Sequence, residues 1–127
     1  MPFAIFLGFF LLMTEPVYAE WIEAASATNG LKAYVNLDTL RRNGDSVEMW
    51  NLYDYENKET ERQNLSSEVQ QEFDCREERY RILAFTDFAE NMGNGSVLFS
   101  ASRSSDWMPV EPDTIVESIW NIACTTE

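Results

Sequence analysis

Residues 80–88 read Tyr80-Arg-Ile-Leu-Ala-Phe-Thr-Asp-Phe88, the clearest strand pattern in the chain. Successive side chains of a strand point to opposite faces of a sheet, so alternate residues share a face. The predicted faces carry Tyr80, Ile82, Ala84, Thr86 and Phe88 on one side and Arg81, Leu83, Phe85 and Asp87 on the other. This stretch predicts a sheet as the main element of the fold.

Further strand patterns flank this stretch. Asn43-Gly44 is a typical hairpin turn and precedes the strand-like run Val47–Tyr55. A hairpin turn joins antiparallel strands, so neighbouring strands are expected to be antiparallel. Leu37–Leu40 predicts one helical or 3₁₀ turn, and the polar run Glu56–Asn64 predicts an exposed loop or a hairpin tip. The remaining predicted strands are Trp21–Ile22, Lys32–Asn36, Ser67–Cys75 and Val97–Ser100. Together these patterns predict an antiparallel sheet of about six strands.

The period of the pattern changes near the C-terminus. Thr114-Ile-Val-Glu117 is a capping box, the usual start of a helix. Apolar residues then recur at helical spacing, at Ile115, Ile119 and Ile122. A helix of about 10 residues that ends at Cys124 is therefore expected, and it needs packing against the sheet because helices this short are marginal in water. The predicted fold class is α+β, with this C-terminal helix on one face of the sheet.

The first residues have the pattern of an export signal. Phe3–Met13 is almost uniformly apolar and, as a helix, would span roughly 16 Å, about half of a bilayer core. Pro16 and the small residue Ala19 fit a cleavage site after Ala19, although Met1-Pro2 lacks the usual basic residue. We therefore predict a signal peptide over residues 1–19 and a single domain over residues 20–127, with no membrane insertion after cleavage. The alternatives for the apolar run are a retained membrane anchor and a buried strand or helix.

Export would place the two cysteines in an oxidising compartment. In an oxidising compartment the even count predicts a disulfide, and the one intramolecular pairing available is Cys75–Cys124. Such a bridge would tether the C-terminal helix to the sheet. The alternative is two free buried thiols in a cytosolic protein. Neither cysteine follows directly after Ala19, so no lipid anchor is expected.

Composition excludes several classes of function. The chain has 22 acidic and 9 basic residues and a net charge of −13, which disfavours binding to nucleic acid or to anionic lipid. It contains no histidine, so Ser-His-Asp catalysis and histidine-containing zinc sites are impossible. No catalytic motif is found among the other residue types. We predict no enzyme activity, no catalytic residue, no metal site and no cofactor.

Several short motifs follow one another along almost the whole exported chain. They are Trp21, Tyr34-Val-Asn36, Val47-x-x-Trp50, Ser66-Ser67, Phe73-Asp-Cys75, Tyr80-Arg-Ile82, Trp107-x-x-Val110-x-Pro112 and Cys124. Their order and spacing resemble the bacterial surface-adhesin protein E-like domains. The resemblance implies an antiparallel sheet with a C-terminal helix tethered by the disulfide. It also implies that some members bind host extracellular-matrix proteins, while many small exported members have no known role.

The predicted function is that of a binding module. Trp107 lies in a proline-flanked segment and is the candidate for contact with a protein partner, because an exposed indole offers a large contact area. Arg76, Arg79 and Arg81 predict either an anion-binding patch or cross-strand ion pairs. The leading hypothesis is an exported, non-enzymatic interaction domain in the periplasm or at the surface of a bacterium, possessing adhesin-like binding. The alternative is a structural or accessory subunit of an envelope assembly.

Overall fold

The computed structural model describes residues 20–59 and 62–127. The predicted signal peptide over residues 1–19 lies outside the described residues. A seven-stranded antiparallel sheet forms the body of the fold, in the order β1-β2-β3-β4-β5-β6, with β7 also paired to β5. The strands are β1 (Ile22–Ser26), β2 (Lys32–Asn43), β3 (Ser46–Asp54), β4 (Ser66–Asp74), β5 (Arg79–Phe88), β6 (Val97–Ala101) and β7 (Met108–Pro109).

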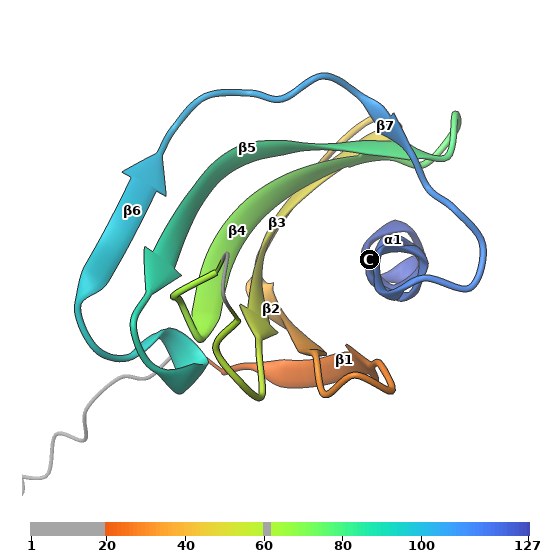
Figure 1. Cartoon of the computed structure of the whole chain (residues 1–127). Helices are drawn as coiled ribbons and strands as arrows, with labels where there is room; N and C mark the ends of the chain where they lie inside the picture. Colours follow the sequence, from red (N-terminus) through yellow and green to blue (C-terminus); the bar gives the residue numbers. More distant parts are fainter. Residues whose placement is uncertain (1–19, 60–61) are drawn as a thin grey trace, which may run out of the picture.

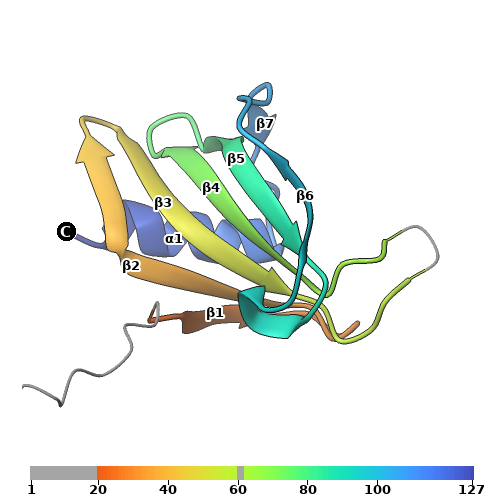
Figure 2. The same cartoon turned by 90° about the vertical axis from the view of Figure 1, so that its left-hand side faces the viewer.

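One helix completes the fold. The sheet curves strongly around α1 (Ile115–Thr125), which lies in its concave side (Figure 1). Figure 2 shows the helix lengthwise behind the strands. The predicted α+β class is confirmed. The core between helix and sheet consists of Ala33, Val35, Val47, Met49, Phe73, Ile119 and Ala123.

Both ends of α1 are fixed. Thr114 caps the start, where its Oγ1 accepts a hydrogen bond from the Glu117 N–H at 3.2 Å, as the capping box predicts. Near the other end, Cys124 forms a disulfide with Cys75, directly after β4. The predicted disulfide tether is therefore confirmed. Within residues 20–59 and 62–127, no helix has the length and apolar character needed to cross a bilayer.

Arg42, near the end of β2, caps the C-terminal end of α1. Its Nη2 donates to the carbonyl oxygens of Thr126 at 3.0 Å and Ala123 at 3.2 Å, groups that a helix end leaves without partners. Arg42→Ala is expected to lower the free energy of unfolding by about 1 kcal/mol, measured by urea denaturation. Arg103→Ala removes an exposed arginine elsewhere and should cost less than about 0.5 kcal/mol. Equal losses in the two variants would contradict the cap.

The predicted helical turn at Leu37–Leu40 is wrong. β2 continues through these residues, and its pairing with β3 is interrupted there by a bulge. The Asn36 side chain accepts from the Asp38 N–H at 3.1 Å. The Thr39 hydroxyl donates to the Asn36 carbonyl at 2.7 Å and accepts from the Trp50 N–H at 2.9 Å. Side chains thus replace the missing ladder bonds and keep the strand continuous.

The predicted faces of β5 are correct only up to Ile82. Gln71 of β4 pairs with Ile82 and Gln70 pairs with Ala84, so Leu83 is an extra residue in β5. Beyond this bulge the alternation is reversed. Phe85 and Asp87 therefore share the concave face with Tyr80 and Ile82. This reversal places a carboxylate and an aromatic ring on the face that the sheet curves around.

Candidate functional site

The concave face is only partly covered by the helix. α1 packs on β1, β2, β3 and β4, and the side of β5 and β6 is left open. Two adjoining cavities of about 450 Å³ each open there, and they share Tyr55 and Ser67 as walls. We call them together the concave trough. Its apolar half lies beside the N-terminal end of α1, and its polar half lies toward β6.

The apolar half has an uncharged lining. Its floor includes Gln71, whose Oε1 accepts hydrogen bonds from Asn51 at 2.7 Å and from the Tyr53 hydroxyl at 3.2 Å. Burial raises the pKa of Tyr53 far above its ordinary value, so this phenol stays neutral. An apolar side chain would find a fitting surface here. The lining residues are Leu31, Tyr53, Tyr55, Ser67, Val69, Gln71, Tyr80, Ile82, Phe85, Ile115 and Val116.

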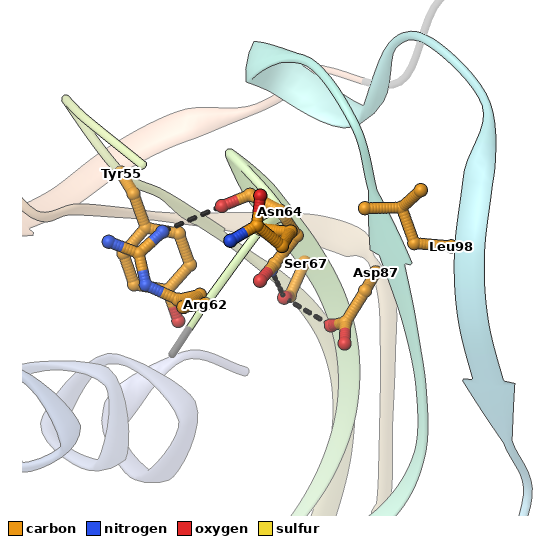
Figure 3. Close-up of a pocket in the computed structure, with 7 residues that line it drawn as sticks. Tyr55, Arg62, Asn64, Ser67, Asp87 and Leu98 are labelled. Atoms are coloured by element: carbon orange, nitrogen blue, oxygen red, sulfur yellow. Dashed lines mark hydrogen bonds between the residues drawn. The ribbon is translucent and has the colours of Figure 1, made fainter. Parts of the chain in front are cut away.

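The polar half contains a chain of hydrogen bonds (Figure 3). Asn64 Nδ2 donates to Ser67 Oγ at 2.9 Å, and Ser67 donates in turn to Asp87 Oδ1 at 2.6 Å. Asn64 and Ser67 are buried, whereas Asp87 is partly buried. Leu98 forms the wall on the side of β6. The carboxylate of Asp87 is thus held in a fixed position at the edge of an apolar surface.

Arg62 lies in the opposite wall of the polar half. Its guanidinium stacks 3.7 Å above the centroid of the Tyr55 ring. It also donates to the carbonyl oxygens of Asn64 at 2.6 Å and Asn57 at 2.9 Å. Its charge faces the Glu59 carboxylate at 3.7 Å. These contacts tie the loop between β3 and β4 to the trough.

Strand β6 forms an apolar rim beside the trough. Val97, Leu98 and Phe99 are 56%, 48% and 57% exposed, in a run from Asn91 to Ser102 that contains no charged residue. Leu98 is a bulge residue, since Val97 pairs with Phe88 and Phe99 pairs with Asp87. Phe99 therefore shares the concave face with Asp87. The centroid of its ring lies 5.6 Å from that of Phe85, which lines the apolar half of the trough. Val97 pairs with Phe88 and faces the other side of the sheet. Leu98, Phe99 and the trough form one continuous surface, which we call the docking surface.

Trp107 lies apart from the docking surface. Its ring stacks under the guanidinium groups of Arg79 at 4.5 Å and Arg81 at 4.4 Å. These arginines alternate with the concave residues of β5 and so lie on the convex face. Arg79 pairs with Asp74 at 2.9 Å and Arg81 pairs with Glu72 at 2.7 Å, which favours the cross-strand ion pairs over an open anion patch for these two. Contact of Trp107 with a partner stays a prediction.

The docking surface was not predicted from the sequence. Asp87 and Phe85 were placed on the opposite face from Tyr80 and Ile82, because the bulge in β5 leaves no mark in the alternation. One signal was present, namely the uncharged run from Asn91 to Ser102 in a chain that is 24% charged. The Cys75–Cys124 disulfide holds the far end of α1 and does not line the trough. Among the described residues, no cluster of three or more acidic or cysteine side chains is arranged to hold a metal ion.

Comparisons with known proteins agree with this architecture. A family model described as surface-adhesin protein E matches residues 21–125. Two solved structures of Haemophilus influenzae protein E align with TM-scores of 0.62 and 0.59, at 15% and 16% identity. The alignments cover 87% and 86% of this chain and 90% of each protein E chain. At this identity the structures show a shared fold. No curated protein sequence matches the chain.

Proposed function

The chain belongs to the surface-adhesin protein E family, and on this basis we propose that it is an exported, non-enzymatic domain that binds an extracellular protein at the bacterial surface. The observation that supports this function is the docking surface. Two exposed apolar side chains of β6, Leu98 and Phe99, adjoin an apolar cavity of about 450 Å³. Exposed apolar surface of this kind is typical of sites for protein partners.

The charge of the chain makes this surface distinctive. A net charge of −13 keeps most of the surface hydrated and repels other acidic molecules. The apolar rim interrupts that acidic surface. Apolar anchors at the centre of a contact supply most of the binding energy, and the surrounding charges select the partner. We therefore expect a partner to be held by Leu98 and Phe99 in particular.

The double substitution Leu98→Ser with Phe99→Ser tests this function. The exported protein is added to immobilised basement-membrane extract, and the concentration giving half-maximal binding is measured. The variant is expected to need about tenfold more protein, since each lost apolar anchor typically costs 1 kcal/mol or more. Val97→Ser removes a similarly exposed side chain that pairs with Phe88 on the opposite face. It should shift binding less than about twofold. Wild-type binding by the double variant would refute the proposed surface.

The location of the protein needs its own experiment. Export predicts an intact mass that lacks residues 1–19, and retention of these residues would contradict it. On intact cells, added protease should degrade the protein if it acts as a surface adhesin. Protection until the outer membrane is opened would favour the alternative, an accessory subunit inside the envelope, for which the same docking surface would serve.

A further inference from the structure

Asp87 is the carboxylate among the residues that line the concave trough. On the convex face, Asp74 and Glu72 each pair with an arginine of β5, at 2.9 and 2.7 Å. The ion pairs among residues 20–59 and 62–127 do not include Asp87, although it is partly buried. A partly buried carboxylate gains stability from a nearby cation. The concave trough thus offers a negative charge without a basic partner.

The basic side chain in the lining of the polar half is already engaged. Arg62 lines the same polar half, but its guanidinium is held by two carbonyl oxygens, by the Tyr55 ring and by the Glu59 carboxylate. Ser67 occupies Asp87 Oδ1 at 2.6 Å. No residue of the described ranges 20–59 and 62–127 donates a hydrogen bond to Asp87 Oδ2, so this oxygen is left to meet a ligand. The Leu98 side chain and the Tyr55 ring lie in the walls of the same cavity.

We propose that the polar half of the trough receives a lysine side chain of the partner protein, whose ammonium group meets Asp87. The aliphatic stem of a lysine would lie along Leu98, because such stems bury readily against apolar surface while the charged end stays polar. The apolar half would take a neighbouring apolar side chain of the same partner segment. The net charge of −13 adds a long-range preference for a basic partner.

The geometry favours lysine over arginine. A guanidinium binds a carboxylate best through two parallel hydrogen bonds, which require both carboxylate oxygens. Ser67 already donates to Asp87 Oδ1, so a guanidinium bound through both oxygens would have to share Oδ1 with Ser67, which weakens that arrangement. An ammonium group is a compact charge that one oxygen can satisfy. This inference rests on the proposed function and adds the chemistry of the partner to it.

Short peptides test the inference directly. The probes are acetyl-Phe-Gly-Lys-Gly-amide and the same peptide with norleucine or arginine in place of lysine. Their dissociation constants with the exported protein are measured by NMR titration, following the backbone amides of Ser67, Asp87 and Leu98. The lysine peptide is expected to bind about three- to fivefold more tightly than the norleucine peptide, the size of a partly exposed ion pair, and more tightly than the arginine peptide.

Two protein variants assign this preference to Asp87. Asp87→Asn keeps an acceptor for Ser67 but removes the charge, so lysine and norleucine peptides should bind equally. Asp38→Asn removes the same charge from an exposed site on β2 and should keep the preference. Three results would overturn the inference. The first is equal binding of the lysine and norleucine peptides to the wild-type protein, and the second is a preference for lysine that survives in Asp87→Asn. The third is the absence of any binding by the lysine peptide. If the Leu98→Ser with Phe99→Ser variant still loses binding to the extract, the proposed function stands while the lysine site fails.

Discussion

Replacement of both Cys75 and Cys124 by serine is expected to lower the free energy of unfolding by about 4 kcal/mol. The bridge closes a loop whose ends are 49 residues apart, and the cost follows from the entropy that this closure removes from the unfolded chain. Net stabilities of small domains are typically about 5–15 kcal/mol, so this loss is a large part of the total. Urea denaturation followed by tryptophan fluorescence gives the value.

The loss should appear first at the helix. α1 has 11 residues, too few to be stable alone in water, and Cys124 holds its C-terminal part against β4. Ile115 and Val116 of the same helix line the apolar half of the trough, so the variant should also bind partners more weakly. Wild-type protein kept in a reducing agent serves as the control and should match the double variant. An unfolding midpoint equal to that of the oxidised wild type would contradict the role of the tether.

The second large effect is expected at Phe73→Ala, with a loss of about 3–5 kcal/mol in the free energy of unfolding. Phe73 is fully buried between the sheet and α1, and its ring stacks with Tyr80 at a centroid distance of 6.5 Å. Truncation to alanine leaves a cavity that close-packed neighbours fill only in part. The matched control is Phe99→Ala, the same chemical change at a ring that is 57% exposed. It should cost less than about 1 kcal/mol, and equal losses would contradict the assignment of the core.

Most of the regular strands and the helix could be predicted from the sequence. Strand-like runs beside turn or polar segments predicted β3, β4 and β6, the capping box predicted the start of α1, and the cysteine count with the export signal predicted the tether. These signals are local or compositional. The two errors, Leu37–Leu40 and the far half of β5, both lie at bulges. A bulge depends on how two strands fit together, so the pattern within one strand does not reveal it.

The candidate site could not be predicted, because one of those errors assigned two of its residues to the wrong face of the sheet. Trp107 was the residue with the strongest sequence signal, yet the structure stacks it on Arg79 and Arg81 of the convex face. Asp87 and Phe85 reach the concave face only because Leu83 shifts the register of β5. The docking surface also joins the β3–β4 loop, β5, β6 and the start of α1. Such a combination of distant segments follows from tertiary structure and not from any one motif.

The bulge at Leu98 is expected to hinder aggregation through strand β6 at high protein concentration. An outer strand with exposed apolar side chains and a regular row of N–H and C=O groups allows neighbouring copies to add strands and aggregate. The extra residue in β6 breaks the regularity of that row. The strand can therefore expose apolar side chains while its backbone is a poor template for fibre growth.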